Sequence, residues 1–371
     1  MTNFSREELQ RYSRHLILPE VGEAGQYKLK ASKILIVGAG GLGSPVSLYL
    51  AAAGVGKIGI IDHDTVDMSN LQRQIIYTTS DAGKSKVERA AARLRELNPE
   101  IEVVEHSSKL SAENALEVIR DYDVVVDGTD NFSTRYLVND ACVMLGKPNV
   151  HGAIYRFEGQ VSVFAPPKGP CYRCLFPSPP PPEAVPNCAE GGVLGVLAGT
   201  IGALQATEAL KLVLRIGQPL IGRLLIYDAL DMNFDTLNLA RTPDCPMCGD
   251  KRTITKLEDI VVACAVPSND VTPQMVREKL NAKSIFLLDV RTPQEHSLAS
   301  IPGATLIPLN ELPERTSELQ RDDDIVVYCK SGGRSAKACE ILKDAGFKKV
   351  HNMAGGITRW AKEIDPSLAV Y

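Results

Sequence analysis

Short apolar runs alternate with amphipathic stretches along the first half of the chain. The runs with strand character cover residues 33–40, 57–62, 101–106 and 122–130. Helices are predicted between them over residues 42–54 and 84–99, and Pro99 closes the second one. Strands and helices that alternate in this way favour an α/β fold with a doubly wound, mostly parallel sheet.

The pattern changes in the second half of the chain. Residues 176–192 are too rich in proline for a helix or a central strand, and they are predicted to form a mobile loop. A strand over 223–230 and the short segment 242–250 then complete the first domain. We therefore predict a first domain over residues 1–250 and a linker over 251–264. A second, smaller α/β domain, which resumes the alternation, is predicted over 265–371.

The long apolar stretch 193–216 has the length of a membrane-spanning helix. Four polar residues interrupt it: Gln205, Thr207, Glu208 and Lys211. The stretch is therefore interpreted as a mostly buried helix of a soluble domain, and no membrane partner is expected.

Composition and charge restrict the function further. The chain has 371 residues, of which 44% are hydrophobic and 23% charged, and its net charge is −4. These values are ordinary for a globular protein and do not favour a nucleic-acid partner. The N-terminal residues are polar and lack the apolar core of a signal peptide. Nine cysteines without such a signal favour metal binding or catalysis over disulfides, and the expected location is cytoplasmic.

A glycine motif follows the first strand directly. The sequence GAGGLG at residues 38–43 has its four glycines at Gly38, Gly40, Gly41 and Gly43. Such glycines let backbone N–H groups approach a phosphate at the start of a helix. Asp62 ends the next strand, 24 residues after Gly38, where a carboxylate can bind ribose hydroxyls. The motif alone fits a dehydrogenase as well as an enzyme that uses ATP.

Polar residues beyond the strand ends favour ATP. Arg73 and Gln74 follow the strand that carries Asp62, Lys86 lies one turn into the next helix, and Asp130 ends a third strand. Two cations and a carboxylate at strand ends suit a triphosphate with magnesium, because the cations neutralise phosphate charge and the carboxylate holds the metal. The alternative is that Arg73 and Lys86 are solvated helix charges.

Two pairs of cysteines have the spacing of metal ligands. Cys171 and Cys174 form one CxxC pair, and Cys245 and Cys248 form another. Four thiolates complete a tetrahedral shell, so the pattern predicts a structural zinc site. Either pair alone could instead be a redox dithiol.

The motifs GAGGLGSP, IDHDTVDMSNLQRQ, GKSK and DGTDNFSTRYLVND resemble the MoeB/ThiF family, which is related to the ubiquitin-activating enzymes. The resemblance covers about residues 1–250. It implies adenylation of the C-terminal Gly-Gly of a ubiquitin-like sulfur carrier protein. It implies Asp62 on the ribose, Asn70, Arg73 and Lys86 around the phosphates and Asp130 on Mg²⁺. It also assigns Arg14 to the ATP site of a partner subunit, which implies a homodimer, and includes the zinc site.

Cys188 lies in the proline-rich loop. A nucleophile on a mobile loop near an acyl-adenylate could take up the acyl group as a thioester or an acyl disulfide. The resemblance places Cys188 at the catalytic or conjugating position of the family. The alternative is an incidental thiol.

The second domain resembles the rhodanese family in three segments, LLDVRTPQEHSLASIPGATLIPL, VVYCKSGGRSA and MAGGITRW, and in the order of these segments. Ala299 and Ser300 stand where the family usually has Gly-His. The backbone N–H groups between Cys329 and Arg334 are predicted to curl around the cysteine sulfur, and Arg334 and the helix start are expected to favour the thiolate and a persulfide. Four residues separate Cys329 from Arg334, one fewer than in cysteine phosphatases, which suits a sulfur atom better than a phosphate.

The expected enzyme is an adenylyltransferase fused to a sulfurtransferase. It would use ATP, Mg²⁺ and Zn²⁺, and a cysteine desulfurase or thiosulfate would donate sulfur. The thiocarboxylate product could serve molybdopterin, thiamine, cysteine or tRNA thiolation, with molybdopterin ranked first. Three alternatives stay open at this point: an activator that conjugates a ubiquitin-like protein through Cys188, a scaffold without activity, and a nicotinamide dehydrogenase.

Overall fold

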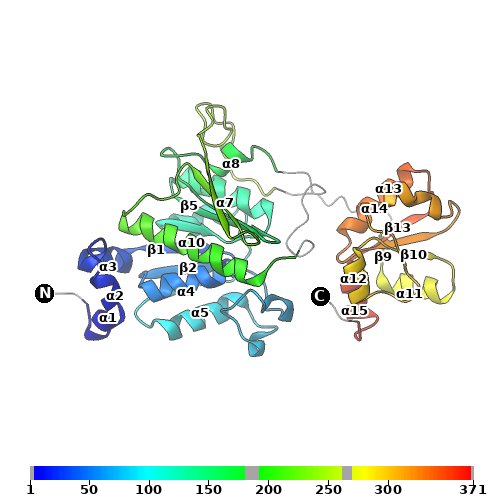
Figure 1. Ribbon diagram of the computed structural model, residues 1–371, viewed down its shortest axis with the longest axis horizontal. Helices are drawn as coiled ribbons and strands as arrows, with labels where there is room; N and C mark the ends of the chain where they lie inside the picture. Colours follow the sequence, from blue (N-terminus) through cyan, green and yellow to red (C-terminus); the bar gives the residue numbers. More distant parts are fainter. Residues whose placement is uncertain (1–3, 180–191, 261–269, 369–371) are drawn as a thin grey trace. The chain divides into compact units, whose positions relative to one another are not determined.

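The structure, a computed structural model, describes residues 4–179, 192–260 and 270–368. Two compact units account for the described residues up to 260 and from 270 onward. The helices and strands of each are labelled in Figure 1. The predicted α/β fold is confirmed for both units.

Unit 1 is built on an eight-stranded sheet with the order β3-β2-β1-β4-β5-β6-β7-β8. Its strands are β1 (Lys33–Val37), β2 (Lys57–Ile61), β3 (Glu102–His106), β4 (Val124–Asp127), β5 (Asn149–Tyr155), β6 (Glu158–Phe164), β7 (Arg223–Asp228) and β8 (Asn233–Asn238). Neighbouring strands in the part β3-β2-β1-β4-β5 of this sheet are parallel, as predicted. The remaining part, β5-β6-β7-β8, is antiparallel. All six residues of the edge strand β8 are exposed, so this strand lacks the buried apolar pattern by which a strand is recognised in a sequence.

Helices cover both faces of this sheet. They are α1 (Arg6–Arg11), α2 (Ser13–Leu16), α3 (Gly22–Ala31), α4 (Gly43–Ala53), α5 (Lys86–Leu97), α6 (Ala115–Arg120), α7 (Phe132–Leu145), α8 (Tyr172–Leu175) and α10 (Gly195–Leu214), with 3₁₀ turns at Met68–Asn70 and Thr79–Asp81. One apolar core joins the sheet to α4, α5 and α10, and a second joins its other face to α6 and α7. The apolar stripe of α5 explains its burial, and Ser85 caps its first turn by accepting from Glu88 N.

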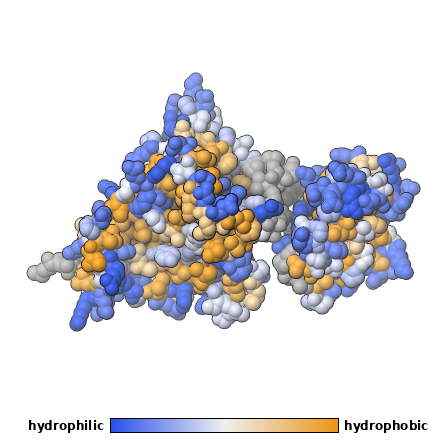
Figure 2. All heavy atoms as spheres, in the orientation of Figure 1, coloured by the Kyte–Doolittle hydropathy of each residue, from blue (hydrophilic) through white to orange (hydrophobic). Residues whose placement is uncertain are grey.

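Helix α10 is long and apolar enough to span a membrane by length and composition. It packs against α4 and strands β4, β5 and β6. In its most apolar window 44% of the residues are buried, and the other positions of the helix are half-buried except Val196 and Thr207, which are exposed. Figure 2 shows apolar side chains gathered over α10 and α4. Val196 on α10 is 69% exposed and Tyr49 on α4 is 59% exposed.

Residues beyond 250 continue to pack on unit 1. Asp259 Oδ1 accepts from Ala112 N at 3.0 Å. Leu257 packs against the core beneath α6 and α7, and Ile254 packs against the cysteine cluster. The compact unit therefore extends about ten residues into the segment predicted as a linker.

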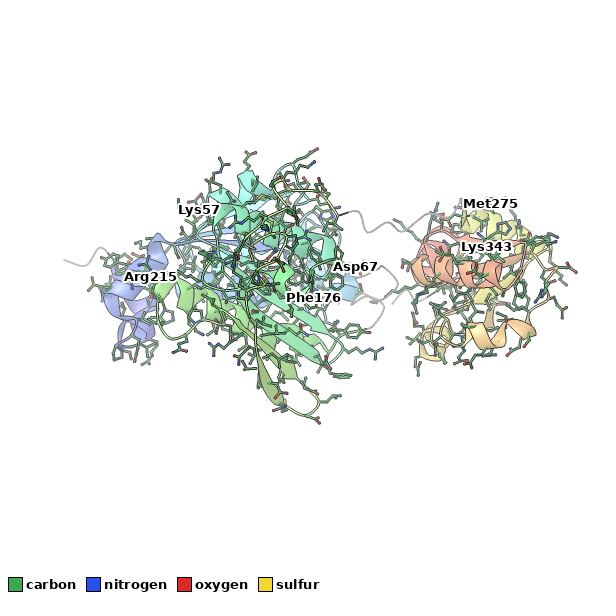
Figure 3. All side chains as sticks on the ribbon, turned by 90° about the horizontal axis from the view of Figure 1, so that it is seen from above. Lys57, Asp67, Phe176, Arg215, Met275 and Lys343 are labelled. Atoms are coloured by element: carbon green, nitrogen blue, oxygen red, sulfur yellow. The ribbon has the colours of Figure 1, made fainter. Side chains whose placement is uncertain are left out.

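Unit 2 has a five-stranded parallel sheet with the order β11-β10-β12-β13-β9. Its strands are β9 (Asp270–Val271), β10 (Phe286–Asp289), β11 (Thr305–Leu306), β12 (Ile325–Tyr328) and β13 (Val350–Met353). Its helices are α11 (Pro273–Asn281), α12 (Pro293–Leu298), α13 (Leu312–Arg315), α14 (Gly333–Asp344) and α15 (Gly356–Glu363), with a 3₁₀ turn at Thr316–Glu318. Figure 3 labels Met275 on α11 and Lys343 at the end of α14. Apolar cores lie on both faces of this sheet.

Candidate functional site

A cavity of about 340 Å³ lies at the carboxyl ends of β1, β2 and β4 in unit 1. This is the edge of a doubly wound sheet where ligands bind. Eight of the predicted nucleotide-site residues line it: Gly38, Gly40, Gly41, Asp62, Arg73, Gln74, Lys86 and Asp130. The tertiary structure therefore brings predicted residues as far apart in the sequence as Gly38 and Asp130, which are 92 positions apart, to one cavity.

The glycine loop depends on its glycines for two different reasons. Gly38 has a φ of +92°, a conformation that side chains disfavour, and its N–H donates to Ile61 O at 2.9 Å. Gly43 does not line the cavity, but a Cβ at this position would overlap Gly38 O. The loop can fold back on the start of α4 only because both positions lack a side chain.

Asp62 is held against the glycine loop. Its Oδ2 accepts from Ala39 N at 2.8 Å, and its Oδ1 accepts from Asp64 N at 2.9 Å. A carboxylate has about four acceptor sites, so two or so remain for the hydroxyls of a ribose.

Arg73 and Lys86 provide positive charge along the cavity wall. Arg73 Nη1 donates to Ser69 O at 3.1 Å. Lys86 has a side chain only 8% exposed, and its Nζ lies 3.0 Å from Asp64 Oδ2. The buried and paired Lys86 does not fit the alternative of a solvated helix charge, whereas Arg73 is half-buried and its guanidinium binds a backbone carbonyl.

Gln74 lies against the glycine loop. Its Nε2 is 3.7 Å from the position that a Cβ on Gly40 would occupy. Gln74 is 3% exposed, and its Oε1 has no hydrogen-bond partner among the described residues. A buried acceptor without a partner costs about 1–3 kcal/mol, so this amide is suited to receive a hydrogen bond from a ligand.

Asp130 follows β4 and brings an exposed carboxylate to the cavity. The turn before it is held from two sides. Buried Asp127 accepts from Thr129 N at 3.1 Å and from Thr129 Oγ1 at 2.6 Å, while Arg135 Nη2 donates to Thr129 O at 3.0 Å. Burial alone would raise the pKa of Asp127, but the hydrogen bond from His151 and the charges of His151 and Arg135 lower it overall. Asp127 is therefore a fixed anion that anchors the turn.

Two predicted nucleotide residues lie elsewhere. Arg14 is exposed on α2 and is not among the residues that line the cavity of its own chain. Asn70 ends a 3₁₀ turn and its Oδ1 lies 3.4 Å from Asp67 N, outside the cavity lining.

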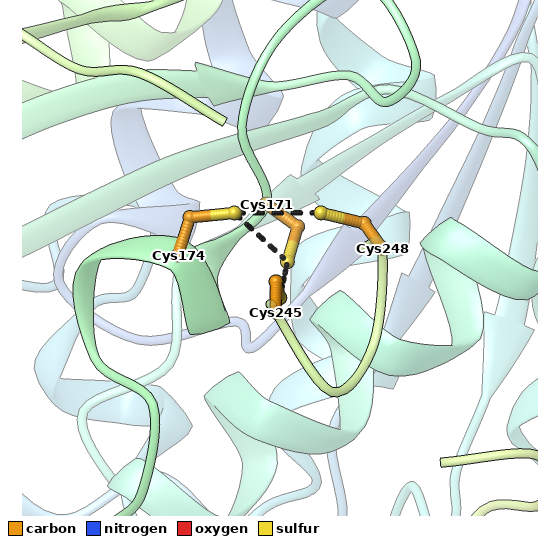
Figure 4. Close-up of side chains that lie close together, drawn as sticks. All are labelled: Cys171, Cys174, Cys245 and Cys248. Carbon is orange, nitrogen blue, oxygen red and sulfur yellow. Dashed lines mark hydrogen bonds between the residues drawn. The ribbon is translucent and has the colours of Figure 1, made fainter. Parts of the chain in front are cut away.

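The four predicted zinc ligands meet at one point, where their sulfur atoms face one another (Figure 4). The sulfur–sulfur distances are 4.0 Å for Cys171–Cys174, 3.6 Å for Cys171–Cys245 and 3.4 Å for Cys174–Cys248. A tetrahedral zinc with Zn–S bonds of about 2.3 Å requires sulfur atoms about 3.8 Å apart. Burial raises the pKa of Cys171 and, to about 11, that of Cys248, so a divalent cation would be what holds them as thiolates. The donor set fits zinc.

Cys188 lies outside the described residues. Cys329 follows β12 at the start of a loop that leads into α14, and its sulfur is fully buried. Gly332 N donates to Cys329 Sγ at 3.1 Å, and Ser335 Oγ lies 3.3 Å from the same sulfur. Gly332 has a φ of +106°, which turns its N–H inward. Of the backbone N–H groups predicted to surround the sulfur, that of Gly332 donates to it.

Arg334 at the start of α14 forms an ion pair with Glu295. Its Nη1 and Nη2 each lie 2.7 Å from an oxygen of Glu295, and both side chains are mostly buried. Glu295 also accepts from Thr292 N at the start of α12. The guanidinium therefore connects the cysteine loop to α12, while Gly332 N and Ser335 Oγ contact the Cys329 sulfur.

Sequence reasoning missed several residues of both sites. Asp64 and Thr129 stand next to predicted strand ends, and this position could have identified them as residues near the cavity. Ser335 directly follows Arg334. Glu295 and Asn352 are 34 residues before and 23 residues after Cys329, and nothing in their local sequence links them to it.

Two family profiles match the chain. The ThiF family matches residues 12–247, and the rhodanese-like domain matches residues 272–363.

Proteins of known sequence are similar to this chain over nearly its whole length. "Probable adenylyltransferase/sulfurtransferase MoeZ" of Mycobacterium tuberculosis is 48% identical over 99% of this chain and 96% of its own length. Adenylyltransferase and sulfurtransferase MOCS3-1 of Zea mays is 44% identical over 97% of this chain and 83% of its own. A sulfur carrier protein adenylyltransferase of Thermus thermophilus is 55% identical over 71% of this chain and 99% of its own length.

Solved structures resemble unit 1. A crystal structure of E. coli MccB with ATP aligns with a TM-score of 0.57 at 26% identity, over 67% of this chain and 75% of that chain. Another crystal structure of E. coli MccB aligns with a TM-score of 0.59 at 25% identity, over 68% of this chain and 75% of that one.

Proposed function

This chain belongs to the ThiF family and carries a rhodanese-like domain, and from this premise we propose that it adenylates a ubiquitin-like sulfur carrier protein and then transfers sulfur to it. One observation carries the proposal. The same chain holds a cavity lined by a glycine loop, two cations and carboxylates, and a buried cysteine whose sulfur accepts backbone and hydroxyl donors.

The first reaction takes place in the cavity of unit 1. The C-terminal carboxylate of the carrier attacks the α-phosphorus of ATP, the bond from this phosphorus to the bridging oxygen of the β-phosphate breaks, and pyrophosphate leaves. Asp62 binds the ribose, and Arg73 and Lys86 stabilise the charge that develops on the phosphates. Gln74 Oε1 accepts a hydrogen bond from the nucleotide. Asp130 offers an oxygen ligand of the kind Mg²⁺ prefers, and the metal would neutralise phosphate charge there.

The second reaction starts from Cys329. The outer sulfur of a Cys329 persulfide attacks the carbonyl carbon of the acyl-adenylate, and AMP leaves. The product is an acyl disulfide between the carrier and Cys329. A second thiol, for which we propose Cys188, then attacks the Cys329 sulfur, so that the carrier leaves as a thiocarboxylate and a protein disulfide forms. A cellular dithiol reduces this disulfide before the next turnover.

The sulfur donor is a cysteine desulfurase persulfide or thiosulfate. We place the product in molybdopterin biosynthesis, because the motifs of unit 1 resemble MoeB, with thiamine, cysteine and tRNA thiolation as the alternative destinations. We place the enzyme in the cytoplasm, where a reducing environment would keep its seven described cysteines out of disulfides.

We also propose a homodimer in which Arg14 reaches the ATP site of the partner subunit. Two observations support it. Arg14 is exposed and is absent from the lining of its own cavity. The outer sides of α10 and α4 expose apolar residues, which is typical of a contact surface. A zinc ion on the four cysteines is proposed to join the segment around Cys171 to the segment around Cys245.

Paired variants of the full-length protein test the two reactions separately. Asp130→Ala should abolish carrier-dependent exchange of pyrophosphate into ATP and keep sulfur transfer from thiosulfate to cyanide. Cys329→Ala should do the reverse, with Asp322→Ala (exposed) and Cys339→Ala (buried, on α14) as matched controls. Mass spectrometry of the carrier after incubation with ATP and a sulfur donor should show oxygen replaced by sulfur. Exchange that survives in Asp130→Ala, or sulfur transfer that survives in Cys329→Ala, would show the assignment to be wrong.

A further inference from the structure

A chain of buried polar side chains leads from Cys329 to the surface of unit 2. Ser335 Oγ lies 3.3 Å from Cys329 Sγ and 2.6 Å from Asn352 Oδ1. Asn352 Nδ2 in turn donates to Asp270 Oδ1 at 2.8 Å. Ser335 is fully buried and Asn352 is 5% exposed, so solvent does not compete for these bonds.

The orientation of the Asn352 amide follows from its other partner. An ionised aspartate only accepts hydrogen bonds, so the amide nitrogen must face Asp270 and the amide oxygen must face Ser335. Asn352 therefore acts on Ser335 as an acceptor that competes for the hydroxyl proton.

The Ser335 hydroxyl has a single proton and three acceptors within reach. They are Asn352 Oδ1 at 2.6 Å, Gly332 O at 3.1 Å and Cys329 Sγ at 3.3 Å. When Cys329 is a neutral thiol, the short bond to Asn352 is preferred, and the S–H group can donate to Ser335 Oγ. When the sulfur becomes an anion, a charge-assisted bond from the hydroxyl to the sulfur becomes the stronger one.

We propose that Ser335 is a catalytic residue of the sulfur-transfer reaction, a switchable donor that turns its hydroxyl proton from Asn352 to Cys329 whenever the cysteine sulfur carries negative charge. Asn352 is the positioning residue that holds the proton in the other state. The inference rests on the proposed role of Cys329.

The switch acts at the two steps in which Cys329 is an anion. In the first, the Cys329 thiolate attacks the outer sulfur of thiosulfate, a sulfur–sulfur bond forms, and the bond to the sulfite group breaks with sulfite taking its electron pair. In the second, the cellular dithiol attacks the Cys188 sulfur of the protein disulfide, a new sulfur–sulfur bond forms there, and Cys329 leaves as a thiolate with the electron pair of the broken bond. Only routes that generate the Cys329 thiolate require the serine.

Alkylation of Cys329 by iodoacetamide tests the proposal in the full-length protein, with peptide mass spectrometry to separate Cys329 from the other cysteines. Ser335→Ala should move the pH of half-maximal alkylation upward by about one unit, because one hydrogen bond to the thiolate is lost. Asn352→Leu removes the competing acceptor and should move it downward. Ser297→Ala, which removes an exposed hydroxyl that donates to Gln294 O on α12, serves as the control.

Opposite shifts in the two variants cannot come from a general loosening of the loop, which would move both in one direction. An unchanged profile in Ser335→Ala, or shifts of the same sign in both variants, would overturn the proposal. The measurement reads the Cys329 sulfur directly, so it is independent of whether Cys329 carries the persulfide. At pH 7 Ser335→Ala should also slow sulfur transfer from thiosulfate about tenfold, without a change in pyrophosphate exchange.

Discussion

Arg291 forms a fully buried ion pair with Asp289 in unit 2, and its replacement by methionine provides a quantitative test of how this unit is held together. Both side chains are 0% exposed. Arg291 Nε and Nη2 bind the two oxygens of Asp289 at 2.9 and 2.6 Å, and Nη2 also donates to Ala299 O at 2.7 Å. The arginine therefore ties the end of β10 to the end of α12.

The expected cost follows from what the substitution leaves behind. Asp289 keeps the bond to His296 Nδ1 at 2.8 Å but loses both guanidinium bonds in a fully buried site. Removal of one partner of a buried ion pair costs about 3–5 kcal/mol. Methionine refills part of the volume beside Tyr328, so we expect a loss near the lower end, about 3 kcal/mol. With a urea slope of about 1.2 kcal/mol/M for a unit of this size, the unfolding midpoint should fall by roughly 2.5 M.

Fluorescence of Trp360 provides the assay, because it is the only tryptophan of the chain and lies buried in the core of unit 2. Arg277→Met, at an exposed position on α11, is the matched control. The double variant Asp289→Leu with Arg291→Met removes both charges and should recover part of the loss. A loss below about 1 kcal/mol, or a double variant no more stable than Arg291→Met alone, would refute the reasoning.

Three further predictions concern unit 1. Cys248→Ser should lower bound zinc, measured by mass spectrometry of the metal, from about one per chain to a small fraction, because three thiolates are left. Lys86→Met should reduce kcat/KM for pyrophosphate exchange by about 100-fold, because the cation that stabilises phosphate charge in the cavity of unit 1 is lost. Sulfur transfer from thiosulfate, which depends on Cys329 in unit 2, should be unchanged. Burial lowers the pKa of His151, so below about pH 6.5 the unfolded chain binds the extra proton and stability rises with pH through this window. His151→Gln should therefore reduce the difference between the urea midpoints of unit 1 at about pH 5 and pH 7.5. Circular dichroism measures the unfolding of unit 1, and Trp360 fluorescence identifies the separate transition of unit 2.

The cysteine loop shows how far local sequence extends toward a site. Cys329 and the backbone that surrounds its sulfur are adjacent in sequence, and their geometry could be predicted from a strand end, two glycines and a helix start. The direction of Arg334 could not. A long cationic side chain binds the nearest desolvated carboxylate, and Glu295 comes close only when α12 packs beside the loop.

The amino-acid sequence by itself predicted the α/β class, the polar residues that line the cavity of unit 1, the four clustered cysteines and the loop after Cys329. These features depend on periodicity, on backbone conformations that require glycine, and on ligand spacings, all of which are local. Tertiary structure alone decided the antiparallel extension β5–β8, the anchoring of Thr129 by Asp127, and the meeting of Ser335 with Asn352. Buried polar groups must find partners wherever the packed chain brings them, and sequence distance says little about which partners those are.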